Sequence, residues 1–318
     1  MALSDLQVFS DYVYSASTEV LDQQIQLFNA ATNGGIVLRS ASNTGDYSDE
    51  AFWKKIDGLV RRRNAYGSGA VTAKTLEHLL KTSVKVAAGT PPVNIDPGMF
   101  RWIQRNPEEA GATIGQQMAG DTLADMLNSI LKVFVVASGQ ISGVTYDGTA
   151  GTSSLSTLNS GAALFGDRAQ DIGVWVMHSK AMHDIYGTAL ANSERLFQFG
   201  NVQVMSDGYG RPLVMTDSPS LITTGTPDTY HTCGLTSGAL VVEQNGDFDS
   251  NTESSNGTEN ITRTYQAEWS YNLGIKGFAW DKTNGGASPN DTALATATNW
   301  DRYATSDKDL AGVLVNTQ

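Results

Sequence analysis

The sequence YQAEWSYNLGI, residues 265–275, alternates two kinds of side chain with a period of two. Its odd positions hold Tyr, Ala, Trp, Tyr, Leu and Ile, and its even positions hold Gln, Glu, Ser, Asn and Gly. Because successive side chains of a strand point to opposite faces, the pattern predicts a strand with one buried face. At ~3.3 Å per residue the strand is on the order of 36 Å long, well above the usual length. Its apolar face needs a partner of similar length.

Residues 106–138 carry the strongest helix pattern in the chain and are the natural partner. Asn106 suits the N-cap, Pro107 the first helical position and Glu109 the capping-box position. Apolar residues then recur at spacings of three and four as far as Phe134. At ~1.5 Å per residue the helix is on the order of 50 Å long, and we expect it to pack against the strand. Three glycines predict a bend or close packing in its first half: Gly111, Gly115 and Gly120.

The segments before this helix differ in character. Residues 1–45 are predicted to form an arm with a short helix that begins at Thr18 and ends at Gly34 and Gly35. Residues 46–95 indicate an extended, hairpin-like portion that projects from the body. Neither segment is expected to bury its apolar residues within one subunit. We therefore expect contacts with neighbouring copies at seven positions: Phe52, Trp53, Arg61, Arg62, Arg63, Val84 and Val86.

Residues 150–245, between the helix and the long strand, indicate a compact α/β unit. The pattern predicts a strand at 174–177, a helix capped by Ser179, a hairpin over 202–215 and a strand at 238–242. The polar residues 246–260 are predicted to form an exposed loop.

The composition limits the function. The chain has 318 residues, a net charge of −12 and 17% charged residues, against a norm of ~25%. A polar, weakly charged surface suits large contacts between copies, and the acidic balance counts against a dedicated reader of nucleic acid. The single cysteine, Cys233, excludes an intramolecular disulfide. No signal peptide and no run of 18 apolar residues is visible, so we expect no membrane span.

Few residues suggest chemistry. A thiol hydrolase built on Cys233 and His231 is an alternative, because two residues apart on a strand share one face; a buried structural cysteine is the simpler interpretation. The series Asp247, Asp249 and Asn251 resembles a calcium loop, but the glycine and the final glutamate of such loops are missing. His178 and His183 lack a zinc-protease pattern. We expect no catalytic, cofactor or metal site.

Four stretches carry a resemblance to a known family: VWVMHSKAMHDIY at 174–186, GRPLVMTDSP at 210–219, RTYQAEWSYNLGIKGFAW at 263–280, and Asn299-Trp300 followed by KDLAGVLV at 308–315. Together with the order of elements, they make the chain similar to a family of tailed-bacteriophage major capsid proteins over nearly its whole length. The resemblance implies an α+β fold. It comprises an N-terminal arm (1–45), an extended loop region (46–95), a peripheral domain (96–149 and 246–295) with a spine helix at 106–138 and long β-strands, an axial α/β domain (150–245) and a C-terminal segment (296–318).

The resemblance also implies a function. Such a protein self-assembles into the pentamers and hexamers of an icosahedral head around double-stranded DNA, and it is not an enzyme. The expected partners are copies of the chain, a separate scaffolding protein, a portal and a decoration protein. The scaffold is implied because no long charged segment precedes the arm. Assembly is expected in the host bacterial cytoplasm, with the mature location in the virion capsid.

Contact with the packaged DNA is expected to be weak and non-specific, through four candidate residues: Arg61, Arg62, Arg63 and Lys132. Three other functions remain as alternatives: a tail-tube or decoration protein, the thiol hydrolase, and a cell-surface binding module. A tube protein is usually shorter and lacks a long spine helix, and the strands of a surface module usually recur every ~8–12 residues.

Overall fold

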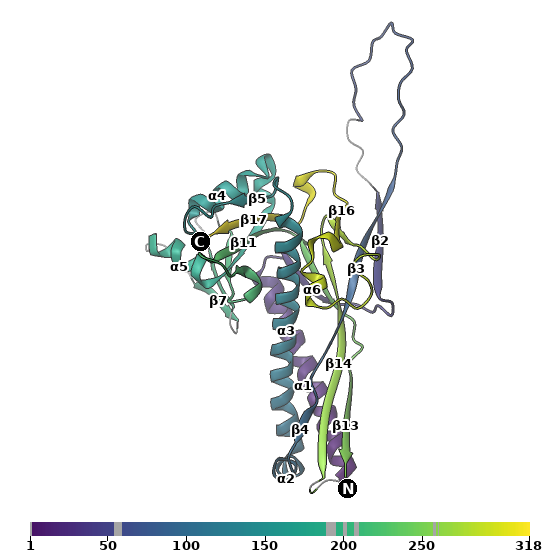
Figure 1. Ribbon diagram of the computed structural model, residues 1–318, viewed down its shortest axis with the longest axis vertical. Coiled ribbons are helices and arrows are strands. Elements are labelled where there is room, and N and C mark those ends of the chain that lie inside the picture. Colours follow the sequence, from purple (N-terminus) through teal and green to yellow (C-terminus); the bar gives the residue numbers. More distant parts are fainter. Residues whose placement is uncertain are drawn as a thin grey trace.

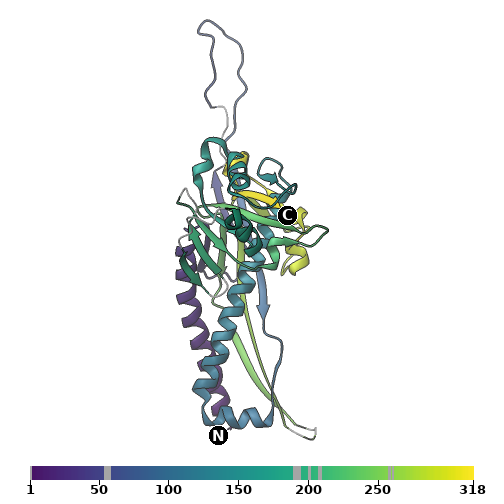
Figure 2. The same cartoon turned by 90° about the vertical axis from the view of Figure 1, so that its left-hand side faces the viewer.

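The structure of the chain is a computed structural model, which describes residues 2–53, 59–188, 195–199, 202–206, 210–256, 259 and 261–318. The molecule is elongated, with a compact sheet unit beside one half of a long helix and a loop that projects beyond it (Figures 1 and 2).

The helices are α1 (Ala2–Ala31), α2 (Pro97–Arg105), α3 (Pro107–Gly139), α4 (Leu155–Ala163), α5 (Ser179–Thr188) and α6 (Asp291–Leu294), with short 3-10 turns η1 (Gly166–Asp171), η2 (Pro219–Leu221), η3 (Ala297–Asn299) and η4 (Asp307–Asp309). The strands are β1 (Ile36–Ser40), β2 (Tyr47–Trp53), β3 (His78–Gly89), β4 (Val93–Ile95), β5 (Thr145–Asp147), β6 (Ile172–Met177), β7 (Arg195–Phe199), β8 (Val202–Ser206), β9 (Pro212–Met215), β10 (Ile222–Thr223), β11 (Thr229–Thr236), β12 (Leu240–Gln244), β13 (Asp249–Ser255), β14 (Thr262–Ile275), β15 (Phe278–Trp280), β16 (Trp300–Arg302) and β17 (Gly312–Thr317).

The spine helix forms where the sequence predicts it. Helix α3 begins at Pro107, and the Asn106 side chain donates to a carboxylate oxygen of Glu109 at 2.6 Å. This is a side-chain contact, and it replaces the backbone bonds of a capping box. By length and composition α3 is apolar enough to cross a bilayer, but 67% of its most apolar 18-residue stretch is buried inside the protein. It is the core helix of the fold.

The N-terminal segment differs from the predicted arm, because α1 is a continuous helix of 30 residues with Thr18 in its interior. It lies along α3 (Figure 2). Gly111 and Gly115 of α3 allow the backbones of the two helices to come close together. A Cβ at Gly115 would lie 2.8 Å from the Val13 carbonyl oxygen, and one at Gly111 would lie 2.7 Å from the Tyr12 Cβ. The apolar side of α1 is therefore buried within the subunit, and the expectation that this segment needs a neighbour is wrong.

The long strand is β14, in a sheet of order β1-β12-β14-β3-β2, to which β13 and β4 also pair. Tyr265 and Ala267 are buried while Gln266 and Glu268 are exposed, as the alternation predicts. Beyond Trp269 both faces are buried. The second face accommodates polar residues in a hydrogen-bond network of Asn245, Ser270 and Asn272.

Strand β14 packs against α3, as predicted. Leu273 is fully buried and shares one apolar core with Leu127 and Ile130 of the helix. The hydroxyl of Tyr271 lies 2.8 Å from a carboxylate oxygen of Asp125. The polar segment 246–260, in contrast, is not only a loop: β13 pairs with β14 over seven residues, from Asp249↔Glu268 to Ser255↔Thr262.

The compact unit contains a second sheet, of order β5-β17-β11-β6-β9-β8-β7. Its centre is tight: a Cβ at Gly234 would lie 2.6 Å from the buried ring of Trp175. The unit's predicted boundaries need two corrections. Strand β12 belongs to the first sheet, between β1 and β14, and β17 from the C-terminal segment lies between β5 and β11. The cap of α5 also differs, since His178 Nδ1 accepts from the Lys180 amide at 3.1 Å.

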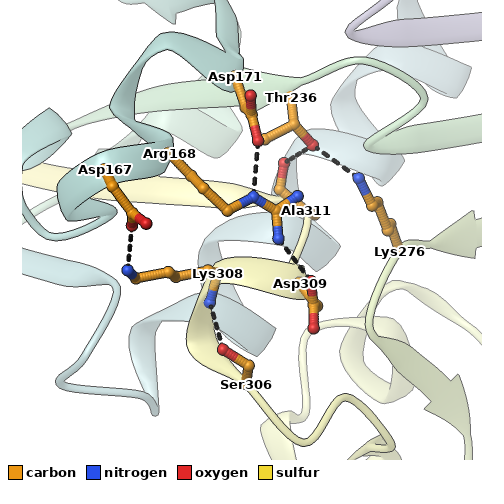
Figure 3. A network of polar contacts seen from close by, with 9 residues as sticks. All are labelled: Asp167, Arg168, Asp171, Thr236, Lys276, Ser306, Lys308, Asp309 and Ala311. Carbon is orange, nitrogen blue, oxygen red and sulfur yellow. Dashed lines mark hydrogen bonds and ion pairs between the residues drawn. The ribbon is translucent and has the colours of Figure 1, made fainter. Parts of the chain in front are cut away.

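A network of charged residues attaches the C-terminal segment to this unit (Figure 3). Arg168 bridges Asp171 at 2.8 Å and Asp309 at 2.6 Å, and Lys308 pairs with Asp167. These contacts join η4 to η1, so the turn that precedes β17 is fixed on the sheet unit.

Candidate functional site

The projecting loop, defined here as residues 59–77, emerges between β2 and β3. These strands pair from Tyr47↔Val84 to Trp53↔His78, where the two rings lie 3.7 Å apart. Every residue of the projecting loop is exposed, Val60 by 95% and Tyr66 by 99%. It extends away from the body in both views (Figures 1 and 2). A segment with this much uncovered apolar surface is typical of an interaction site.

The base of the loop is held by polar contacts. Asp49 of β2 accepts from Thr82 at 2.7 Å and from Lys282 at 2.5 Å. These bonds hold the pKa of the Asp49 carboxyl below its usual value, and the Lys282 contact is the larger cause. Glu50 lies 3.6 Å from Lys81. The root of the loop is therefore fixed on the sheet.

The loop is basic in an acidic chain. Residues 59–77 hold four Lys or Arg and one Asp or Glu, a net charge of +3, whereas the whole chain carries −12. Arg61, Arg62 and Arg63 are all exposed. Among the described residues none of the three has an ion-pair partner.

The other predicted contact residues have different positions. Val84 is fully buried and Val86 is 6% exposed, because both belong to the apolar core that also contains the buried side of α3. The expectation that neighbouring copies bury these two valines is therefore wrong. Trp53 is 59% exposed and remains a candidate. The backbone of Phe52 pairs with Leu79, but its side chain lies outside the described residues.

A groove of about 660 Å³ runs between α3 and strands β3, β4 and β14. Its lining is largely apolar, with Val86, Ile103, Ile114, Met118 and Trp269. Three carboxylates also line it: Asp121, Asp125 and Asp291. A second cavity of about 350 Å³ shares Asp125 and Asp291 and extends to Lys132. The two together follow α3 over much of its length, and we call them the spine groove.

The carboxylates of the spine groove differ in environment. Burial raises the pKa of Asp125, although the hydrogen bond from Tyr271 opposes the shift. All three residues reach the surface, and within the described part of the chain neither Asp121 nor Asp291 has a cationic partner. None of these carboxylates was predicted as a site residue from the sequence. The signal that points to them is the spacing of Asp121 and Asp125, four residues apart on one side of an apolar helix.

Lys132 is half-buried on α3 and lines the second cavity beside Asp125 and Asp291. The arginines of the projecting loop do not line this cavity, and the loop extends away from the body of the molecule (Figure 1). The four candidate DNA contacts therefore do not form one cationic surface in the subunit.

The cysteine and histidine of the hydrolase alternative are not arranged as a nucleophile and base. Cys233 is fully buried on β11, and burial raises the pKa of its thiol. His231 contacts Asn316 through Nδ1 and Thr223 through Nε2, each at 2.8 Å. A thiol that is neutral and shielded from solvent is a poor nucleophile.

The three residues that resemble a calcium loop, Asp247, Asp249 and Asn251, make different contacts and do not form one site. Asp247 accepts from the Ser270 amide at 2.8 Å and pairs with Lys85 at 3.2 Å, whereas Asp249 and Asn251 belong to β13. Its carboxylate is therefore engaged in the fold. The described residues contain no cluster of His, Cys, Asp or Glu that would hold a metal ion.

The family model of major capsid protein 13-like proteins matches residues 5–314. The chain belongs to this Gp13-like family of major capsid proteins. Similar folds occur in solved capsids. The cyanophage Pam1 capsid matches with a TM-score of 0.54 and 11% identity over 89% of this chain and 88% of that chain. The capsid of Ralstonia phage GP4 matches with a TM-score of 0.52 and 11% identity over 90% of this chain and 87% of that chain. No curated protein sequence matches.

Membership in the Gp13-like family establishes the function of the chain. It is a phage major capsid protein that forms the shell of the head. The family is structural, and its match along the chain replaces the tail-tube, decoration and surface-module alternatives. In this capsid protein α3 is the spine helix, β14 the long strand beside it, and the second sheet the compact unit.

Proposed function

We propose that copies of this capsid protein join into the pentamers and hexamers of an icosahedral head, and that the projecting loop makes the principal contact between neighbours. The exposure of residues 59–77 carries this proposal, because their apolar side chains have no cover within the subunit. Trp53, at the loop's root, belongs to the same contact. The two large sheets and the helix pair form the body from which the loop extends (Figure 1).

Replacement of residues 59–77 by a short Gly-Ser turn tests the loop. The variant keeps the paired strands β2 and β3, so it is expected to fold with an unchanged circular dichroism spectrum. Electron microscopy of the expressed protein with its head proteins should then show shells for the wild type and dispersed subunits for the variant. Normal shells from the variant would contradict this role.

The enclosed genome is held mainly by confinement and counterions, since the chain carries −12. At most Arg61, Arg62, Arg63 and Lys132 touch DNA, without sequence preference. The test is titration of a free subunit with a duplex in ~150 mM salt, where non-specific binding lies near 10⁻⁴–10⁻⁶ M. Nanomolar affinity for a defined duplex would contradict the proposal.

The compact unit is proposed to occupy the centre of each capsomer. It lies beside one half of the elongated body, and a ring of wedge-shaped subunits places such a compact end at its axis (Figure 1). The turn at 223–226 would face the axis; most of the second candidate turn, residues 207–209 of 206–210, lies outside the described residues. A capsid map with residues 223–226 far from every axis would overturn the placement.

The remaining partners follow from the same function. A shell built in the host cytoplasm requires a scaffolding protein supplied separately and a portal, and the mature surface offers a place for a decoration protein. Expression with and without each neighbouring head gene, followed by microscopy, tests these partners one at a time. Closed shells of uniform size from the chain alone would remove the need for the scaffold.

A further inference from the structure

Two parallel strands in the middle of the second sheet end side by side and bring His178 next to Asp217. Strands β6 and β9 pair as far as Met177↔Met215, and the Thr216 amide donates to the Met177 carbonyl oxygen at 3.0 Å. Because parallel strands run in the same direction, the residues that follow them leave the sheet at the same edge. His178 Nε2 therefore lies 3.6 Å from a carboxylate oxygen of Asp217.

His178 is also the N-cap of α5. Its carbonyl oxygen accepts the first helical bond, from the Met182 amide at 3.1 Å, and its Nδ1 accepts from the Lys180 amide at 3.1 Å. A helix leaves its first amides without partners, so a side-chain acceptor at this position stabilises it. Because Nδ1 is the acceptor, the neutral ring carries its proton on Nε2, the atom that faces Asp217.

A proton on Nδ1 removes this cap. The imidazolium has an N–H group at each ring nitrogen and no acceptor, so Nδ1 and the Lys180 amide would both be donors. The positive end of the helix macrodipole also disfavours a cation at this position. The common N-cap residues keep their acceptor near neutral pH, whereas a histidine loses its acceptor when it is protonated.

The surroundings of the ring oppose protonation. The His178 side chain is 14% exposed, and its ring lies 5.3 Å from that of Tyr230 on β11. Asp217 favours the charged ring, but its side chain is 64% exposed, and exposed pairs contribute little. Lys180 and Asp184 of α5 pair with each other at 2.5 Å. Burial is the larger influence, and it lowers the pKa of His178 below its ordinary value of 6.5.

The later part of α5 does not depend on the cap. Ala181, Met182 and Ile185 are buried in the apolar core of the chain. Loss of the cap therefore frees the first turn of α5 without detaching the whole helix.

We propose that His178 is a proton-sensitive cap, which fixes the first turn of α5 on the second sheet when it is neutral and releases that turn in mild acid. Linkage gives the direction. Because the folded pKa is lowered, the folded chain binds fewer protons than the unfolded chain between the folded value and 6.5. The stabilisation is fully present above 6.5 and is lost as the pH falls through the folded value. Acid thus acts on the compact unit and not on the projecting loop.

Histidine NMR of unassembled subunits tests the state of the ring. The chain has four histidines, and replacing each by Asn, one at a time, assigns their signals. Above neutral pH the ring of His178 should be the Nε2–H tautomer, and its titration midpoint should lie below 6.5. An Nδ1–H tautomer, or a midpoint at or above 6.5, would overturn the proposal.

Hydrogen exchange measures the cap itself, with two matched variants. His178→Asn supplies an acceptor that does not titrate, and His183→Asn removes an exposed histidine of the same helix. Between pH ~7.5 and ~5.5, where histidine titrates, the protection of the first-turn amides should fall by about fivefold in the wild type, the usual effect of a lost cap. His183→Asn should show the same fall, and His178→Asn should show none.

A third variant, His178→Ala, has no acceptor and should show the reduced protection at both pH values. Full protection of the wild type in acid, or a loss in His178→Asn as large as in the wild type, would show that His178 is not the sensor. Circular dichroism establishes that each variant folds. If His178→Asn fails to fold, the wild-type titration still decides, because the other three variants assign the His178 signal by elimination. Both measurements use unassembled subunits, so neither result depends on the proposed function.

Discussion

The hydroxyl of Tyr271, in the middle of the long strand, donates a 2.8 Å hydrogen bond to the carboxylate of Asp125 on the spine helix. Ser129, one helical turn further, lies 3.2 Å from the same hydroxyl. The spine helix α3 and the long strand β14 are therefore joined by a polar contact as well as by their shared core. Its position beside the spine groove makes this contact a measure of the groove's integrity.

Tyr271→Phe should lower the free energy of unfolding by about 0.5–1.5 kcal/mol, the usual net value of one hydrogen bond. The ring and its packing stay, so only the hydroxyl contacts are removed. Denaturant unfolding of unassembled subunits measures the difference. The matched control is Tyr12→Phe, which removes an exposed hydroxyl 3.0 Å from Glu108. An equal loss in both variants would show that burial of the Tyr271 contact has no effect.

Asp125 should make stability depend on pH in a defined direction. Its pKa is raised in the folded chain by burial, so between the ordinary value of 3.8 and the folded value the native state binds more protons than the unfolded state. The contribution is fully present below 3.8 and is lost as pH rises through the folded pKa. Asp125→Asn should remove this decline from the stability profile. A wild-type profile that rises more steeply than that of the variant over this window would contradict the assignment.

Two glycine substitutions on α3 should have opposite effects. Gly115→Ala forces a Cβ to within 2.8 Å of the Val13 carbonyl oxygen and 2.9 Å of the Ala16 Cβ, and overpacking of this kind costs about 1–3 kcal/mol. Gly120→Ala meets nothing within 4 Å, so the better helix propensity of alanine should stabilise the chain by up to about 1 kcal/mol. Thermal unfolding of both variants should show shifts of opposite sign. A lower melting temperature for both variants would mean that the absence of a side chain at residue 120 also stabilises the fold, which would contradict this prediction.

Cys233 should be unreactive in the native chain. Its side chain is fully buried on β11, and burial raises the pKa of the thiol, so little thiolate exists to react. A chromogenic disulfide reagent should label the wild type only after denaturant is added, with Cys233→Ala as the unlabelled reference. Rapid labelling of folded subunits would show that the compact unit opens. Cys233→Ser buries a hydroxyl and is expected to cost about 1–3 kcal/mol without changing shell geometry.

The sequence predicted the elements that bury a single face, because such elements show a clear alternation of apolar and polar residues. The alternation from Tyr265 to Trp269 and the caps at Asn106 located β14 and α3, because each of these elements has one apolar face and one polar face. The projecting hairpin between β2 and β3 was also predicted. Val84 and Val86 were assigned to the wrong surface, since alternation gives a buried face without saying which chain covers it.

The errors arose where distant segments come together. Polar residues on α1 obscured a helix whose stability comes from close contact with Gly111 and Gly115 of α3, about a hundred residues away. Strands β12 and β17 were placed in neighbouring units because short apolar runs do not specify their partners. The spine groove is lined by residues from eight separate elements, α1, α2, α3, α6, β3, β4, β14 and η2, so no local sequence pattern predicts it.

The position of β17 between β5 and β11 has a consequence for synthesis. Seventy-six positions separate the end of β11 at Thr236 from the start of β17 at Gly312, and at ~5–20 residues per second the ribosome needs roughly 4 to 15 s to produce them. During that interval the edge of β11, with His231 and Cys233, is an unpaired strand open to other nascent chains. A phage that makes many copies of this protein at once must protect that edge, so we expect chaperone demand during infection to be concentrated on chains between these two lengths.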